Sequence, residues 1–173
     1  MDDHMNGELR ERAKRISLLL TDIDGVWTDT GVYYSEQGEV MKRFSLRDGM
    51  GVERLRELAG VETGIVTGEN SAAVIKRAEK LGITEVHILV QDKAASVKEI
   101  MERRRITPEK IAFIGDDMND IEAMKTVGLC ACPSDAVTQV MKIAHFVAIN
   151  KGGFGAFRDF AEMIISYKNE EVP

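Results

Sequence analysis

Four stretches of the sequence place side chains that could do chemistry directly after a short apolar run. The runs are "ISLLLTDID", "ETGIVTG", "EVHILVQDK" and "KIAFIGDDMND". The residues at their ends are, in chain order, Asp22, Asp24, Thr67, Gly68, Lys93, Asp116, Asp117 and Asp120. Ligands of parallel α/β sheets bind beyond the carboxyl ends of the strands. If the runs are neighbouring parallel strands, we expect these side chains to meet at one edge of the sheet.

The residue types indicate phosphoryl transfer. Asp22 and Asp24 are two residues apart on an extended segment, so both side chains can face one pocket. One carboxylate could attack phosphorus, and the other could protonate the leaving alcohol and later activate water. Because two anions repel a phosphate dianion, this chemistry calls for a hard cation such as Mg²⁺, with Asp116 as a second protein ligand. Lys93 would offset charge on the transferring oxygens, and Thr67 would hydrogen-bond one of them.

The elements that must position these groups alternate along the chain. Apolar runs predict strands at 16–22, 62–68, 85–90, 110–115, 129–132 and 145–149. Helical spacing of apolar residues predicts helices at 51–60, 70–82, 94–105, 119–128, 136–144 and 154–167. Strands that alternate with single helices predict an α/β fold with a doubly wound parallel sheet. The exception is about 26–44, where β-branched and aromatic residues on either side of "SEQG" predict a β-hairpin.

Length and composition favour a globular protein of one domain spanning 1–173, with flexible termini that include His4. The net charge of −6 disfavours nucleic acid as a partner. No run approaches the roughly 18 apolar residues of a membrane span. The N-terminal residues lack the apolar stretch of a secretory signal, so we expect a cytoplasmic protein. Two cysteines, Cys130 and Cys132, are too few for a disulfide framework and are expected to be buried.

The order "DIDGV", "TG", "K" and "GDDMND" resembles the four motifs of the haloacid dehalogenase superfamily of phosphatases, which have a Rossmann-like fold. Three longer segments resemble the 3-deoxy-D-manno-octulosonate 8-phosphate (KDO 8-phosphate) phosphatase family and its nonulosonate 9-phosphate relatives. They are "DIDGVWTDTGVYYSEQGEVMKRFSLRDGMGV", "RAEKLGI" and "KGGFGAFRDF". The resemblance covers nearly the whole chain and implies a phosphatase for a 3-deoxy-2-keto sugar acid phosphate.

The same resemblance implies roles for individual residues. Asp22 would be the nucleophile, which forms an aspartyl phosphate, and Asp24 the general acid and base. Mg²⁺ would be held by the Asp22 carboxylate, the Asp24 backbone carbonyl and Asp116. Thr67 and Lys93 would bind the phosphate.

The spacing of the motifs excludes a separate domain that covers the site. The segments between Asp22 and Thr67 and between Thr67 and Lys93 are already filled by the predicted elements. A covalent phosphate intermediate nevertheless benefits from a covered, partly dry site. Members of the family are similarly without such a domain and are tetrameric, with the hairpin and C-terminal tail covering a neighbour's site. We therefore expect a homotetramer, with Val26–Phe44 at the interface and Trp27 packed at the subunit contact.

Candidates for contacting the sugar acid are Arg47 and Asp48 in "LRDGMG" and Arg77. An arginine suits a carboxylate because its guanidinium can bind both oxygens, although Arg77 could equally form a surface ion pair. Where octulosonate enzymes usually carry an arginine after "TG", this chain has Glu69, with Lys80 eleven residues on. That pairing resembles the nonulosonate branch, whereas "LRDG" resembles the octulosonate branch. The sugar stays open between the two.

Two other functions are compatible with part of the pattern. A phospho-receiver signalling domain also unites Asp, Thr, Lys and an acidic pair around Mg²⁺, but as a family receivers place the acidic pair first and the acceptor aspartate mid-chain. A catalytically silent oligomerisation module would have lost catalytic residues, and none is missing here. Of the remaining acids, Asp117 or Asp120 would support Lys93 or the water around the metal, and either could instead cap a helix.

Overall fold

The computed structural model describes residues 3–170. Its first half contains α1 (Asp3–Arg15), β1 (Leu18–Thr21), β2 (Val32–Ser35), β3 (Gly38–Lys42), α2 (Leu46–Ala59), β4 (Glu62–Val66), α3 (Ala72–Leu81) and β5 (Glu85–His87). Its second half contains α4 (Lys93–Arg104), η1 (Pro108–Lys110), β6 (Ile111–Ile114), η2 (Met118–Asp120), α5 (Ile121–Thr126), β7 (Leu129–Cys132), α6 (Thr138–Met141), β8 (Phe146–Val147) and α7 (Ala156–Asn169).

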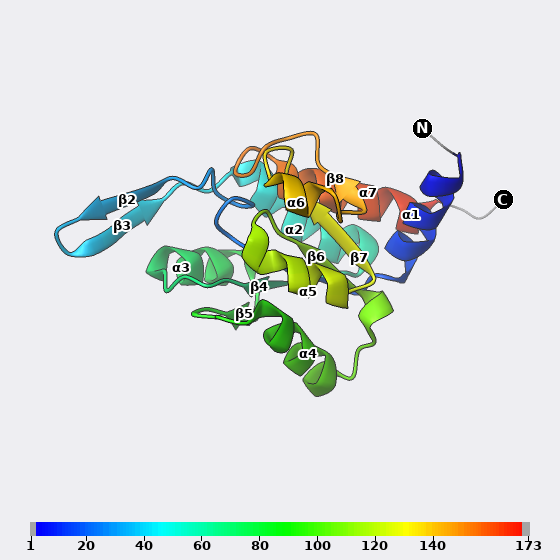
Figure 1. Ribbon diagram of the computed structural model, residues 1–173, viewed down its shortest axis with the longest axis horizontal. Coiled ribbons are helices and arrows are strands. Elements are labelled where there is room, and N and C mark those ends of the chain that lie inside the picture. The colour runs from blue at the N-terminus through cyan, green and yellow to red at the C-terminus, as the bar shows by residue number, and fades with distance from the viewer. Residues whose placement is uncertain (1–2, 171–173) are drawn as a thin grey trace.

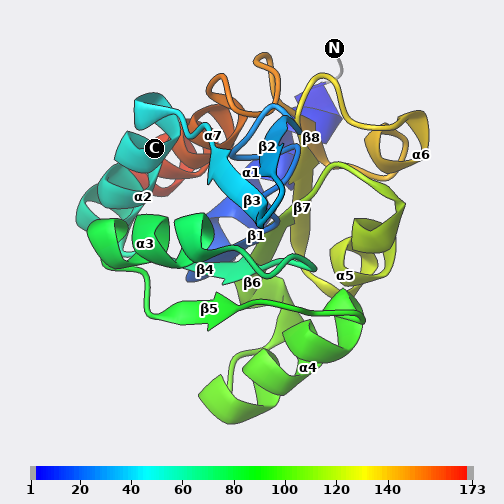
Figure 2. The same cartoon turned by 90° about the vertical axis from the view of Figure 1, so that its left-hand side faces the viewer.

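Six strands form one parallel sheet in the order β5-β4-β1-β6-β7-β8. Alternate residues of β1, β4, β6 and β7 enter two apolar cores, as the two-residue period of a strand requires. In β1, Leu19 packs with residues of α1, α2, α3 and α7, whereas Leu18 and Leu20 pack with residues of α4, α5 and α6. Figure 2 shows α2 and α7 on one side of the sheet and α5 and α6 on the other. The predicted α/β, doubly wound parallel fold is confirmed.

The hairpin of β2 and β3 leaves the body as an arm, on the opposite end of the molecule from α1 and both termini (Figure 1). It is shorter than the predicted 26–44, because residues 26–28 belong to a turn packed in the core. Trp27 is 1% exposed, and its ring centroid lies 5.0 Å from that of Phe157 in α7. The prediction that Trp27 packs at a subunit contact is therefore wrong: its bulk fills the space between the first turn and the last helix.

At the N-terminus, α1 begins at Asp3 and includes the backbone of His4; residues 1–2 and 171–173 lie outside the described part, and flexible termini stay a prediction. One expectation about a helix needs correction. The helix predicted from residue 51 begins at Leu46, because the Ser45 side chain accepts hydrogen bonds from the backbone N–H groups of Arg47 and Asp48. Among the described helices, none is long and apolar enough to cross a membrane.

Candidate active site

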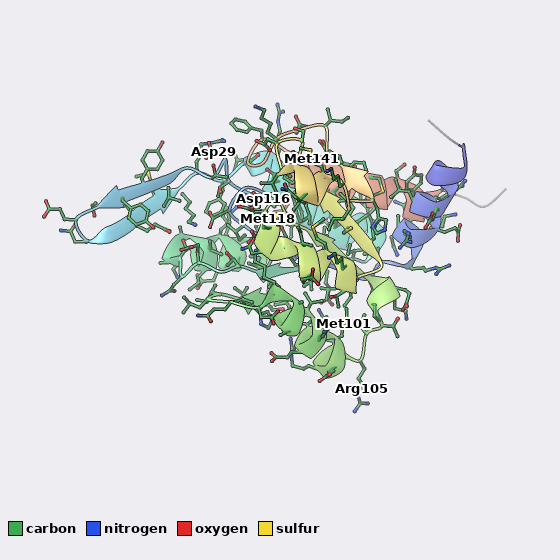
Figure 3. All side chains as sticks on the ribbon, viewed as in Figure 1. Asp29, Met101, Arg105, Asp116, Met118 and Met141 are labelled. Atoms are coloured by element: carbon green, nitrogen blue, oxygen red, sulfur yellow. The ribbon has the colours of Figure 1, made fainter. Side chains whose placement is uncertain are left out.

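A cavity of about 290 Å³ opens at the carboxyl edge of the sheet, below the base of the hairpin. Among the residues proposed from sequence, its lining contains Asp22, Asp24, Thr67, Gly68, Glu69, Lys93, Asp116 and Asp117. In Figure 3, Asp116 and Met118 lie at the end of the sheet from which the hairpin projects. The neighbouring positions of β4, β1 and β6 explain this convergence, because their carboxyl ends share one edge.

The turn after β1 presents Asp22 and Asp24 to the cavity. The Ile23 carbonyl accepts hydrogen bonds from the backbone N–H groups of residues 26–28. Gly25 has a φ of +86°, and a Cβ at this position would lie 1.9 Å from Asp116 Oδ2. Glycine therefore allows both the left-handed backbone and the close approach of the β6 loop.

Lys93, the first residue of α4, forms the cationic centre of the site. Its ammonium lies 2.8 Å from Asp22 Oδ2 and 2.6 Å from Asp120 Oδ1, and its side chain is 1% exposed. Burial alone would lower the pKa of Lys93, but the charges of Asp22 and Asp120 outweigh it and raise the pKa. Lys93 is therefore a fixed ammonium at physiological pH.

Asp120 and Asp117 have different positions. Asp120 is fully buried, and besides Lys93 it accepts hydrogen bonds from the backbone N–H groups of Asp116 at 2.9 Å and Asp117 at 3.2 Å. The Asp117 carboxylate instead accepts from the N–H of Met118 and caps the short helix η2. Asp120 thus holds both Lys93 and the loop that carries Asp116.

Three carboxylates form a cluster with the properties of a divalent-cation site. Asp22, Asp116 and Asp120 each offer an oxygen within 4.8 Å of the others. Burial together with the charges of Asp22 and Asp120 raises the pKa of Asp116 to about 8. Burial and the charge of Asp120 raise the pKa of Asp22 to about 6, against the opposing effect of Lys93. Asp116 Oδ1 is buried and has no hydrogen-bond partner within the described chain. A hard divalent cation fits this arrangement, because it would supply the missing charge and coordinate the unpartnered oxygen.

Asp24 faces away from the acidic cluster and toward the hairpin. Lys42 Nζ lies 2.6 Å from both of its carboxylate oxygens, and the Thr28 hydroxyl donates to Oδ1 at 3.3 Å. Lys42 was not identified from sequence. The alternating pattern of a hairpin strand predicts which residues share a face, but it contains no signal that this face covers Asp24.

The opposite wall of the cavity is formed by the loop after β4. Thr67 is buried, its N–H donates to the carbonyl of His87, and its own carbonyl accepts from the N–H of Val90. Gly68 and Glu69 follow in the same lining. This loop places Thr67 in the same cavity lining as Asp22, as the position after the strand predicts.

The other residues proposed to contact a sugar do not line this cavity. Asp48 is fully buried, and its Oδ1 accepts from the backbone N–H of Arg158, because the early start of α2 turns it toward α7. Arg77 donates to the carbonyl of Ser45 at 2.9 Å. Arg47 and Lys80 are exposed. Of the five candidates for sugar recognition, the described chain brings Glu69 alone to the cavity.

Comparisons with known proteins identify the family of the chain. Residues 6–128 match the family model of haloacid dehalogenase-like hydrolases. The chain is 37% identical over 155 residues to the 3-deoxy-D-manno-octulosonate 8-phosphate phosphatase KdsC of Yersinia pestis. The aligned residues make up 90% of this chain and 82% of that protein.

Solved structures are similarly close. One is the 3-deoxy-D-manno-octulosonate 8-phosphate phosphatase of Moraxella catarrhalis in complex with magnesium ion, phosphate ion and a KDO molecule. Its superposition on this chain has a TM-score of 0.90 at 30% identity and covers 94% of this chain and 93% of that one. The cobalt-bound phosphatase YrbI of Haemophilus influenzae has a TM-score of 0.87 and 31% identity, and covers 91% of both chains. The chain therefore belongs to the haloacid dehalogenase-like hydrolases and, within them, to the family of the 3-deoxy-D-manno-octulosonate 8-phosphate phosphatases.

Proposed function

We propose that this protein is an Mg²⁺-dependent phosphatase that hydrolyses the phosphate ester of 3-deoxy-D-manno-octulosonate 8-phosphate. The observation that carries the proposal is the convergence of Asp22, Lys93, Thr67 and the Asp116 cluster on one cavity, with Asp24 beside it. Family membership at 37% identity supports the substrate, because the relatives that match over most of their length have this activity in their names.

In the first half of the proposed reaction, an Asp22 carboxylate oxygen attacks phosphorus. A bond forms between that oxygen and phosphorus, and the bond between phosphorus and the sugar oxygen breaks. Asp24, in its protonated form, gives its proton to the departing sugar oxygen, so the products are an aspartyl phosphate on Asp22 and the free alcohol.

Thr67 and Lys93 orient the phosphoryl group during this step. Lys93 has three N–H groups, and two of them face Asp22 and Asp120. The third is left for a phosphate oxygen, and the Thr67 hydroxyl binds another. Mg²⁺, held by Asp22, Asp116 and the backbone carbonyl of Asp24, with Asp120 close by, would neutralise the charge that otherwise keeps a phosphate dianion away from Asp22.

In the second half, Asp24 acts as a base. It removes a proton from water, the resulting oxygen attacks phosphorus, and the bond to Asp22 breaks, which regenerates Asp22 and releases inorganic phosphate. The proton ends on Asp24, ready for the next turnover.

We further propose a homotetramer in which the hairpin contributes to a subunit contact. The hairpin exposes four large side chains, Tyr33, Tyr34, Val40 and Met41, each 54–70% exposed. Such apolar surface on a projecting arm is typical of an interface. Sedimentation is expected to show a tetramer, and a fully active monomer would contradict this proposal. The cytoplasmic location and the absence of nucleic-acid or membrane partners stay predictions.

A phosphate-release assay tests the proposed activity. With Mg²⁺ present, 3-deoxy-D-manno-octulosonate 8-phosphate is expected to be hydrolysed faster than a nonulosonate 9-phosphate or generic sugar phosphates, and a chelator is expected to stop the reaction. Preference for the nonulosonate ester would assign the chain to that branch, in line with Glu69 at the cavity. Absence of phosphate release from every ester would overturn the proposed function.

A further inference from the structure

A lysine of the hairpin is buried against the carboxylate proposed to handle the proton. Lys42 is the last residue of β3, and its side chain is 1% exposed. Its ammonium lies 2.6 Å from Oδ1 and 2.6 Å from Oδ2 of Asp24. Burial of a lysine ammonium lowers the stability of the folded state unless the charge is paired and hydrogen-bonded. The fold therefore depends on this contact.

The hairpin residue Glu39 holds Lys42 in place from the other side. Glu39 Oε2 lies 3.7 Å from Lys42 Nζ, and the Glu39 carboxylate accepts a hydrogen bond from the Ser71 hydroxyl. Ser71 is the N-cap of α3 and accepts from the N–H of Val74. The base of the hairpin is therefore tied to the body of the protein through a continuous set of polar contacts that ends on Asp24.

The partners of Lys42 differ from those of Lys93. Two N–H groups of Lys42 reach the same carboxylate, Asp24, and the charge of Glu39 lies 3.7 Å from the ammonium. Lys93 instead joins two different carboxylates, Asp22 and Asp120. Lys42 is thus suited to holding the Asp24 carboxylate in one orientation.

Few contacts other than that with Lys42 hold the Asp24 carboxylate in one orientation. Besides Lys42, the Thr28 hydroxyl contacts the carboxylate at 3.3 Å, and a quarter of the side chain is exposed to the cavity. Without the lysine, the carboxylate could rotate about its side-chain bonds, away from the leaving oxygen. A displacement of about 1 Å in a catalytic group can lower the rate by about 10²-fold.

We propose that Lys42 is a positioning residue, which orients the Asp24 carboxylate for proton transfer and connects the hairpin to the chemical step. This inference rests on the proposed phosphatase activity. It predicts that loss of the lysine lowers kcat and leaves KM nearly unchanged, because the ammonium is almost completely buried and contacts Asp24.

The test compares Lys42→Met with the wild-type protein and with Lys76→Met, which removes an exposed lysine of α3 that pairs with Glu79. Steady-state phosphate release is measured with saturating Mg²⁺ on 3-deoxy-D-manno-octulosonate 8-phosphate. Lys42→Met is expected to lower kcat about 10²-fold, the low end of what a general acid contributes, with KM within threefold of wild type. Lys76→Met is expected to behave as wild type.

A second substrate separates positioning from loss of structure. An aryl phosphate has a leaving group that needs little protonation, so in a single turnover Lys42→Met is expected to release the aryl alcohol with a far smaller loss of rate than the sugar, because the later attack of water is the same for both esters. Equal losses of this single-turnover rate on both substrates, an unchanged kcat on the sugar phosphate, or a raised KM with kcat retained would each overturn the inference. If Lys42→Met fails to fold, Lys42→Gln is scored by the same criteria. An inactive wild type would instead overturn the proposed function.

Discussion

The ammonium of Lys93 lies 2.8 Å from Oδ2 of Asp22, and both side chains are almost completely buried. The proposed nucleophile is therefore held at a fixed position by a charged partner before any substrate arrives. The same lysine also contacts Asp120, so the three groups are one electrostatic unit. The contributions of this site to turnover, to the binding of Mg²⁺ and to thermal stability can be measured separately.

Replacement of the nucleophile should abolish turnover without unfolding the protein. Asp22→Asn keeps the shape of the side chain, but an amide does not attack phosphorus, so we expect phosphate release to fall at least about 10³-fold. Because the change removes a buried negative charge from a repelling cluster, the metal-free variant should melt no lower than wild type. Asp29→Asn, at an exposed ion pair with Arg43, is the matched control. Normal turnover by Asp22→Asn would rule out Asp22 as the nucleophile.

Replacement of Asp24, the proposed general acid and base, should lower the rate without weakening the binding of Mg²⁺. The Asp24 carboxylate faces Lys42, whereas the acidic cluster consists of Asp22, Asp116 and Asp120. Asp24→Asn is therefore expected to lower kcat by about 10²- to 10⁴-fold with Mg²⁺ affinity within a few-fold of wild type by titration calorimetry. Loss of Mg²⁺ binding by a folded Asp24→Asn protein would show that its carboxylate is a ligand.

Stability without metal should decline as the pH rises from about 4 to about 8. Folding raises the pKa of Asp22 to about 6 and of Asp116 to about 8, from an ordinary value of 3.8, chiefly through burial. The folded state therefore binds protons more tightly than the unfolded chain. The resulting stabilisation is complete below the unfolded pKa and is lost as the pH passes through the folded values.

Mg²⁺ should reverse this trend, because its ligands must be deprotonated. The rise in Tm on adding Mg²⁺ is expected to be larger at pH 9 than at pH 6, and thermal melts with and without the metal measure it. Asp116→Asn removes the group with the higher pKa and should flatten the metal-free pH dependence above pH 7. A metal-free Tm that climbs between pH 6 and 9 would contradict the assignment.

The loop after β8 should control the geometry of the first turn. A Cβ on Gly152 would lie 1.9 Å from the carbonyl oxygen of Gly25, and the N–H of Gly153 donates to the carbonyl of Val26. Gly152→Ala is expected to lower kcat at least tenfold and to lower Tm by several degrees, because backbone atoms on either side must move. Gly7→Ala in α1, where a Cβ meets nothing within 4 Å, should leave kcat unchanged and should not lower Tm, because alanine is the better helix former. Wild-type activity in Gly152→Ala would show that the turn tolerates the displacement.

The alternation of strands and helices and the polar residues at the strand ends could be predicted from the amino-acid pattern. These are local properties, since apolar periodicity specifies the buried face of an element and the residue after a strand is carried to its carboxyl end. Asp22, Thr67, Lys93 and Asp116 could therefore be predicted to converge before any coordinates were known.

The partners of these groups depend on long-range packing. Lys42 is 18 residues from Asp24, and Asp120 is 27 residues from Lys93. The two contacts depend on how a hairpin folds over a turn and how a loop enters the core. Trp27 and Asp48 became internal because α7, more than 100 residues later, packs on both segments. Long-range packing of this kind has no local signal, because burial depends on the shape of distant segments and not on the spacing of neighbouring residues.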